Sequence, residues 1–110
     1  MMKAKAILES VLYAKDLEST EKFYTEVLGL EVYSKDSYYI FFKLEQDMLL
    51  IFDKKHTIQQ DSLPRHGTES KGHLAFTMQE SEIDNWRSKL QKHDINIEKE
   101  QSWENGAFSF

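Results

Sequence analysis

The sequence contains no cysteine, one proline and four glycines in 110 residues. Without cysteine the chain can form neither a disulfide nor a thiolate zinc site, and it has no cysteine nucleophile. This composition is typical of a reducing compartment, so we expect a cytoplasmic protein. Residues 1–6 lack the apolar core of a secretory signal. The longest apolar runs, 38–42 and 48–52, are far shorter than the roughly 20 residues of a spanning helix, so no membrane partner is expected.

Basic residues are also fewer than acidic residues. Fourteen Lys and Arg stand against 19 Asp and Glu, which gives a net charge of −5. Because the basic residues are scattered rather than clustered, we expect no nucleic-acid partner. The sequence has no GxGxxG, P-loop, GxSxG or HExxH motif, so dinucleotide, P-loop, hydrolase-elbow and zincin functions lack support. The 40% hydrophobic content is enough for a core, and the length fits a single domain over residues 1–110.

The first half of the sequence predicts one strand, one helix and three further strands. The first strand covers 7–14, and Asp16 is placed to cap the helix that follows. Apolar residues recur on one face of this helix, and Gly29 marks its end. The three further strands are expected at 30–33, 38–44 and 48–52.

The second half repeats this order after a long loop over 53–71. Loops of such length in compact domains are usually functional lids or linkers. Ser81 and Asp84 resemble a capping box at the start of a second helix. The remaining elements are expected as strands at 72–78 and 95–101, a turn at 103–106 and a strand from 107 onward.

This repeat predicts an α+β fold built from two tandem βαβββ modules. The modules would form a curved mixed sheet with the helices outside, and the second module lacks its last strand. The first module is expected at about residues 5–54, the connecting loop at about 54–71 and the second module at about 72–110.

Glu9 is the first candidate for chemistry, because strand alternation places it between Ile7 and Val11 on one face. If that face is interior, the carboxylate needs a partner, a metal ion or a raised pKa. The alternative is a solvated sheet face or an edge strand.

His73 is the second candidate, because the repeat makes its strand the counterpart of the strand that carries Glu9. The repeat should bring these two side chains together near a pseudo-twofold axis. Imidazole and carboxylate are suitable ligands for Zn, Mn, Fe, Co or Ni. A single histidine on a strand can instead be a hydrogen-bonded structural residue, and two ligands do not complete a catalytic metal site.

Four apolar or aromatic residues are candidates for a substrate pocket: Tyr39, Phe41, Leu50 and Trp103. They would suit a planar or apolar ligand, although residues of these types also form ordinary cores. His66, beside Gly67 in the long loop, could be a lid residue, an acid or base, an extra ligand or a solvated histidine.

The block DLESTEKFYTEVLGL (16–30), followed by GHLAF (72–76), resembles the vicinal oxygen chelate superfamily. This superfamily includes glyoxalase I, bleomycin-resistance proteins, extradiol dioxygenases and fosfomycin-resistance enzymes. The resemblance implies a divalent metal held by Glu9 and His73. Leu50 stands near the position where glyoxalase I has a carboxylate, and it cannot ligate. The last ligand, a Glu, would lie in a further segment of roughly 15 to 20 residues after Phe110.

The resemblance implies two alternative functions. The first is a metal-dependent lyase, isomerase, dioxygenase or thiol-adding enzyme that chelates neighbouring oxygens of a small substrate, with Glu9 also moving a proton. The second is a metal-free protein that binds a small molecule or an antibiotic, as the bleomycin-resistance proteins do. The resemblance also implies a homodimer.

Overall fold

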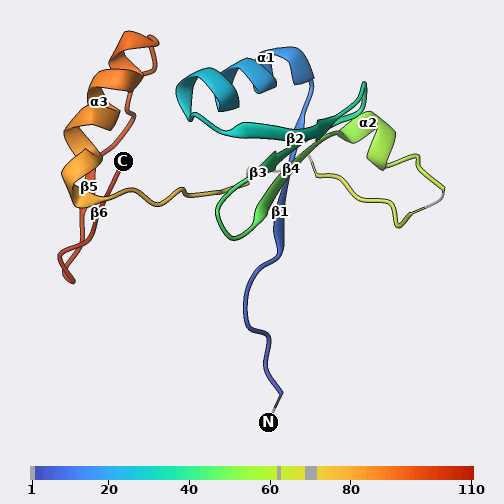
Figure 1. Cartoon of the computed structure of the whole chain (residues 1–110), viewed down its shortest axis with the longest axis horizontal. Helices are drawn as coiled ribbons and strands as arrows, with labels where there is room; N and C mark the ends of the chain where they lie inside the picture. The colour runs from blue at the N-terminus through green and yellow to red at the C-terminus, as the bar shows by residue number, and fades with distance from the viewer. Residues whose placement is uncertain (1, 62, 69–71) are drawn as a thin grey trace. The chain divides into compact units, whose positions relative to one another are not determined.

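The computed structural model describes residues 2–61, 63–68 and 72–110 (Figure 1). Its contacts divide the chain into two compact units, Met1–His73 and Leu74–Phe110. The first unit holds the complete βαβββ module, and the second holds one helix and a short hairpin.

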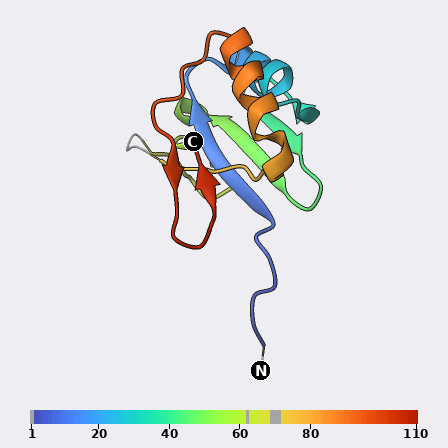
Figure 2. The same cartoon turned by 90° about the vertical axis from the view of Figure 1, so that its left-hand side faces the viewer.

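The first unit is built on a four-stranded mixed sheet with the strand order β1-β4-β3-β2. Strand β1 runs parallel to β4, whereas β3 is antiparallel to both β2 and β4. Figure 2 shows β1 beside β4 along most of its length. The strands are β1 (Glu9–Ala14), β2 (Glu31–Lys35), β3 (Tyr39–Lys43) and β4 (Met48–Asp53). All four strands expected in the first module are therefore present, with their ends shifted by one or two residues.

Asp16 begins the helix as its sequence position predicts. Its carboxylate accepts hydrogen bonds from the backbone N–H groups of Glu18 and Ser19, at 3.1 and 3.2 Å. The helix starts as α1 (Leu17–Lys22) and continues as a π-helical segment, η1 (Phe23–Val27), which the apolar spacing did not predict. Hydroxyl groups that bond to preceding carbonyls often bend helices, and one such bond lies in this segment. The Thr25 hydroxyl donates in this way to the Glu21 carbonyl at 2.8 Å.

The core lies between the sheet and this helix. Four side chains from β3 and β4 make up the fully buried cluster: Ile40, Phe42, Leu49 and Ile51. Leu17 and Tyr24 pack against it from the helix, and Leu12 packs against it from β1. One face of the sheet is thereby covered, as the position of α1 over the strands in Figure 1 illustrates.

The sequence predicted a loop after β4. In the structure this segment is only partly a loop. Its first four residues form a short helix, α2 (Lys54–Thr57), which Asp53 caps by accepting the Lys55 N–H at 2.9 Å. Asp53 is both the last residue of β4 and the capping residue of α2. A single helical turn is too short to show the periodicity by which a helix is detected in a sequence. The expected loop residues 62 and 69–71 lie outside the described residues.

The strand expected at 72–78 is not formed: these described residues carry no strand assignment. A strand requires a pairing partner as well as alternation. In the first module the partner of β1 is β4, the last strand of that module. No described residue of the second unit supplies an equivalent of β4.

The second helix of the repeat is present. It consists of one 3₁₀ turn, η2 (Glu80–Glu82), followed by α3 (Ile83–Lys92). The capping box is formed by Gln79 and Glu82, not by Ser81 and Asp84 as predicted. The helix begins two residues earlier than the expected cap allows, so the Glu82 carboxylate is the one that reaches back, accepting the Gln79 N–H at 3.1 Å.

The second unit ends in a hairpin of β5 (Gln101–Ser102) and β6 (Phe108–Ser109), seen in Figure 2. The predicted turn between them is present, whereas the strand expected at 95–101 is reduced to its last residue and Ser102. Arg87 of α3 donates to Glu100 at 2.7 Å and lies over the Phe108 ring at 5.3 Å. These contacts hold the segment before the hairpin against α3. The sequence pattern had predicted that this segment would instead be part of a longer strand.

Candidate functional site

The sheet face opposite the core gathers most of the predicted site residues. Paired residues of neighbouring strands project from the same face of a sheet, so the register defines rows of side chains across β1, β4 and β3. The three rows are Glu9–Met48–Lys43, Val11–Leu50–Phe41 and Tyr13–Phe52–Tyr39. Four predicted residues (Glu9, Tyr39, Phe41 and Leu50) therefore share this face, which we call the open face.

Aromatic rings at one end of the open face form a continuous cluster. The ring of Phe41 lies 4.2 Å from that of Tyr39 and 5.5 Å from that of Phe52, centroid to centroid. Phe52 meets the ring of His66 edge-on at 4.9 Å, and His66 lies 5.7 Å from Tyr13. We call these five residues the aromatic cluster. The cluster could stack a planar ligand, because each ring has a flat apolar face.

His66 is held in place by two hydrogen bonds, so it is not simply a solvated loop residue. Its Nδ1 lies 2.6 Å from the Tyr13 hydroxyl, and its backbone N–H donates to the Thr57 carbonyl at 3.2 Å. The next residue, Gly67, allows this loop to approach α2 closely, because a Cβ there would lie 2.6 Å from the Ile58 side chain and 2.8 Å from the Lys54 side chain. A larger residue at 67 would require the Ile58 and Lys54 side chains or the loop to shift.

Two members of the cluster, Tyr13 and Phe52, are missing from the sequence-based candidates. Both follow from alternation, since Tyr13 is four residues after Glu9 on its strand and Phe52 is two residues after Leu50. Burial raises the pKa of the Tyr13 phenol, which keeps its proton at neutral pH. Leu50 is only 8% exposed and lies in the middle row, so it is a buried apolar part of the open face.

Glu9 lies at the opposite end of the open face, on the edge strand β1, and its side chain is exposed. The expectation of a buried acid that needs compensation therefore does not apply. Its placement matches the alternative considered from the sequence, a solvated edge strand. An exposed carboxylate remains a suitable ligand for a divalent cation.

His73 is also exposed and lies outside any strand. Glu9 and His73 supply donor types that suit a divalent first-row metal. Within residues 2–61, 63–68 and 72–110, no group of three or more His, Cys, Asp or Glu side chains is placed to hold an ion. A catalytic metal site normally has three protein ligands, and the described residues do not show such a group.

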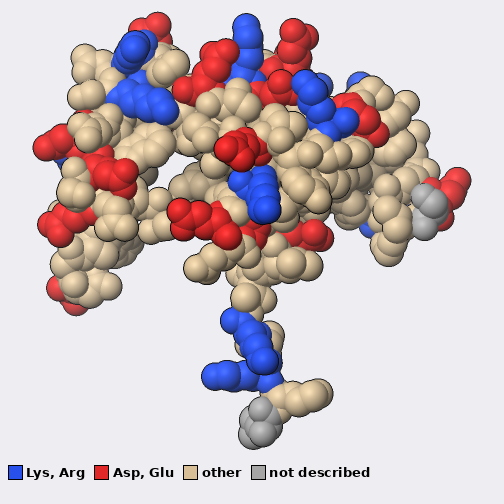
Figure 3. Space-filling model, viewed as in Figure 1, with Lys and Arg blue, Asp and Glu red and all other residues tan. Residues whose placement is uncertain are grey.

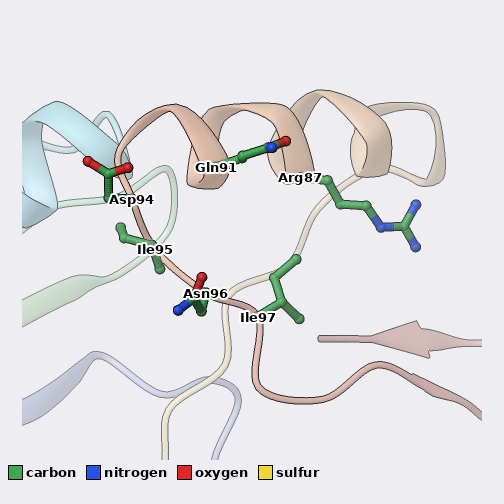
Figure 4. A pocket seen from close by; sticks show the side chains of 6 residues that line it. All are labelled: Arg87, Gln91, Asp94, Ile95, Asn96 and Ile97. Atoms are coloured by element: carbon green, nitrogen blue, oxygen red, sulfur yellow. The ribbon is translucent and has the colours of Figure 1, made fainter.

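Trp103 is placed in the second unit, at the turn of the hairpin, and is 56% exposed. Its indole N–H donates to the Ser109 hydroxyl at 3.0 Å, a contact that stabilises the hairpin. The second unit also contains an open hollow between α3 and the residues after it (Figure 4). It is lined by Arg87, Gln91, Asp94, Ile95, Asn96 and Ile97, none of which was a predicted site residue.

The surface seen in Figure 3 carries acidic and basic side chains intermingled over the four-stranded unit, with no extended basic region on that view. This distribution agrees with the net charge of −5. None of the helices within the described residues has the length and apolar character needed to cross a membrane.

Comparison with protein families finds one match over nearly the whole chain. The family model described as Glyoxalase/Bleomycin resistance protein/Dioxygenase superfamily matches residues 6–109. No curated protein matches the sequence.

Several solved structures are similar to this one. A lactoylglutathione lyase from Agrobacterium tumefaciens is 36% identical, with a TM-score of 0.89 over 96% of this chain and 83% of the other. A glyoxalase/bleomycin resistance protein/dioxygenase from Nocardioides is 20% identical, with a TM-score of 0.71 over 94% of this chain and 72% of the other. FosX, a fosfomycin resistance protein from Listeria monocytogenes in complex with Mn(II) and sulfate, is 20% identical, with a TM-score of 0.65 over 93% and 74%. The last two likenesses concern the fold alone.

Proposed function

The chain belongs to the Glyoxalase/Bleomycin resistance protein/Dioxygenase superfamily, and from that premise we propose that it is a divalent-metal-dependent enzyme acting on a small substrate. The substrate would lie on the open face, against the aromatic cluster. Glu9 and His73 would be the two metal ligands contributed by the described residues. The remaining ligand would come from outside them.

The observation that carries this proposal is the shared face of Glu9 and the aromatic cluster. Glu9, Val11 and Tyr13 are every second residue of β1, so the Glu9 carboxylate and the rings on the sheet lie on the same face. Sites built on strands hold side chains more accurately than sites on loops. A substrate with an apolar part over Phe41 and polar oxygens toward Glu9 would fit this arrangement.

The ion, when bound, would polarise a substrate oxygen as a Lewis acid. The residues of the chain would orient the substrate and move its proton. Glu9 is exposed and on a strand, so its carboxylate is accessible to a proton from a substrate carbon or oxygen on this face. Phe41 and Leu50 would exclude water from the apolar side of the substrate.

The likeness to a lactoylglutathione lyase makes the hemithioacetal of a 2-oxoaldehyde and glutathione the first substrate to assay. Leu50 stands near the position where glyoxalase I has a carboxylate, and an aliphatic side chain cannot bind a metal ion. Leu50 therefore favours a reaction other than that of glyoxalase I. Isomerisation, ring cleavage and thiol addition are therefore all to be assayed, each with Mn, Zn, Fe, Co and Ni.

Metal analysis of the purified protein tests the proposal. We expect wild-type protein to retain a stoichiometric divalent metal that both Glu9→Gln and His73→Ala lose. Glu18→Gln, at an exposed helical position, is the matched control and should retain it. Wild-type protein that binds none of the five metals would contradict the proposal.

A second candidate function, metal-free binding of a small molecule or drug, is favoured by one specific observation. The described residues contain a contiguous aromatic cluster on the open face. This function predicts that an aromatic ligand binds equally well with and without a chelator. Loss of binding in Phe41→Ala but not in Glu9→Gln would identify it.

Homodimer formation and a cytoplasmic location complete the proposal. Sedimentation velocity at two protein concentrations tests the first, and fractionation of cells that express the protein tests the second. A monomer at every concentration would contradict the dimer.

A further inference from the structure

Tyr13 and His66 are 53 residues apart in the sequence, yet a short hydrogen bond joins their side chains on the open face. The Tyr13 hydroxyl and the His66 Nδ1 are 2.6 Å apart, and both residues are partly buried. A second Tyr–His pair in the same unit offers a contrast. Tyr38 and His56 stack face to face at 4.0 Å and 16°, a packing contact without a hydrogen bond between the rings.

The direction of the Tyr13–His66 hydrogen bond follows from the chemistry of the two groups. A phenol is a good donor and a poor acceptor, because its oxygen lone pair is delocalised into the ring, whereas the unprotonated imidazole nitrogen is a strong acceptor. Burial raises the pKa of Tyr13, so its proton is retained and available for donation. The direction of this hydrogen bond depends on the tautomer of His66, and donation by Tyr13 corresponds to the tautomer that carries its proton on Nε2.

In that tautomer the Nε2–H group is a donor at the border of the aromatic cluster. Phe52 meets the imidazole ring edge-on at 4.9 Å with an interplanar angle of 80°, which fixes the orientation of the ring. Among the residues that the structure describes, none is recorded as a hydrogen-bond partner of Nε2, and no side-chain polar atom is both buried and unsatisfied. The donor is therefore open to solvent and to a ligand.

We propose that Tyr13 and His66 form a recognition pair in which Tyr13 orients the imidazole and His66 Nε2–H donates to an oxygen of a ligand stacked on the aromatic cluster. The pair selects aromatic ligands that carry a carboxylate or carbonyl oxygen beside the ring. His66 contacts the ligand, and Tyr13 is a positioning residue. This inference rests on the proposed function only in that a ligand occupies the open face.

The first test examines the pair without a ligand. Long-range ¹H–¹⁵N NMR of the imidazole distinguishes the two neutral tautomers of His66. We expect wild-type His66 to carry its proton on Nε2, and we expect the Nδ1–H form to increase in Tyr13→Phe. Tyr38→Phe, which removes the hydroxyl of the stacked pair, should leave the His66 spectrum unchanged. A wild-type His66 with its proton on Nδ1 would overturn the inference whatever ligand the protein binds.

The second test uses benzoate as the probe and benzylammonium as a matched aromatic ligand without an acceptor. We expect benzoate to shift the signals of His66 Nε2–H and Phe41, and to bind roughly 5-fold more weakly to Tyr13→Phe, as befits one hydrogen bond. His66→Ala should weaken binding by about 10-fold, and His66→Gln, whose amide places a donor near the Nε2 position, should restore part of it. Benzylammonium should be insensitive to Tyr13→Phe, and His66→Ala should weaken its binding less than that of benzoate, because only the ring contact is lost.

The outcomes separate this inference from the proposed function. Benzoate binding that shifts Phe41 but is equal in wild type, Tyr13→Phe and His66→Ala overturns the recognition pair while leaving a ligand on the open face. If benzoate shifts the signals of neither His66 Nε2–H nor Phe41, the pair does not recognise aromatic ligands that carry a carboxylate. The metal analysis of Glu9→Gln and His73→Ala is unaffected by either result.

Discussion

Adjacent residues on β3 perform different tasks, because successive side chains of a strand project from opposite faces. Phe42 is fully buried in the core, whereas Phe41 belongs to the aromatic cluster on the open face. We expect Phe42→Ala to lower the free energy of unfolding by about 3–5 kcal/mol. Phe41→Ala should lower it by roughly 1–2 kcal/mol and should abolish binding of aromatic ligands. Urea unfolding and ligand titration measure both; equal stability losses would contradict the assignment of faces.

Burial raises the pKa of Tyr24 above its ordinary value of 10.0, which makes stability sensitive to alkaline pH. The folded state binds this proton more tightly than the unfolded chain does. The resulting stabilisation is complete below the unfolded pKa and is lost as the pH rises through the folded pKa. We expect the free energy of unfolding to fall less steeply above about pH 10 in Tyr24→Phe than in wild type.

The control for this measurement is Tyr33→Phe, since Tyr33 is 66% exposed. Its pH dependence of unfolding should match that of wild type. If the free energy of unfolding depends on pH in the same way in wild type and Tyr24→Phe up to the highest pH measured, Tyr24 does not cause the loss of stability.

Side-chain positions within one strand could be predicted from the sequence, whereas partners across strands could not. Alternation correctly placed Glu9, Val11 and Tyr13 on one face. It contains no information on register, which aligns Glu9 with Met48 and Tyr13 with Phe52. The Tyr13–His66 bond joins residues 53 positions apart, so no local pattern signals it. The roles of Glu9 and His73 as ligands remain predictions.

The end of the first helix depends on the conformation of Gly29, whose φ is +70°. A Cβ there would meet no atom within 4 Å, so only the backbone opposes a larger residue. We expect Gly29→Ala to destabilise the protein by about 1–2 kcal/mol, and Gly29→Asn to destabilise it less. Thermal and urea unfolding measure the difference.

Gly72→Ala is the matched control, since a Cβ at Gly72 also meets no atom within 4 Å and its φ is not in the left-handed region. We expect its effect on the free energy of unfolding to stay within about 0.5 kcal/mol. If the two alanine variants are equally stable, the left-handed turn at Gly29 is not what ends the helix.

Elements with local signals were predicted well from the sequence, and elements that depend on a distant partner were not. Asp16 and Gly29 bracket the first helix correctly because caps act within a few residues. The strand at 72–78 has the right alternation but lacks a ladder partner among the described residues. The short helix α2 was missed because one turn leaves no periodicity.

At the scale of the molecule, the repeat predicted the α+β fold, and the motifs at 16–30 and 72–76 indicated the superfamily, which the match over residues 6–109 confirms. The reaction did not follow from the fold, because function resides in individual sites rather than in architecture. The chain covers 83% of the Agrobacterium tumefaciens lyase, and its first unit contains the complete four-stranded sheet. We propose that ligand and metal bind on the open face of that sheet.

The most direct test of this central claim is paramagnetic broadening of ¹H–¹⁵N signals by substoichiometric Mn²⁺. We expect the signals of Glu9 and His73 to broaden first and those of the aromatic cluster to follow, with the effect lost in Glu9→Gln and retained in Glu18→Gln. Broadening centred on other acidic residues, or unchanged in Glu9→Gln, would contradict it.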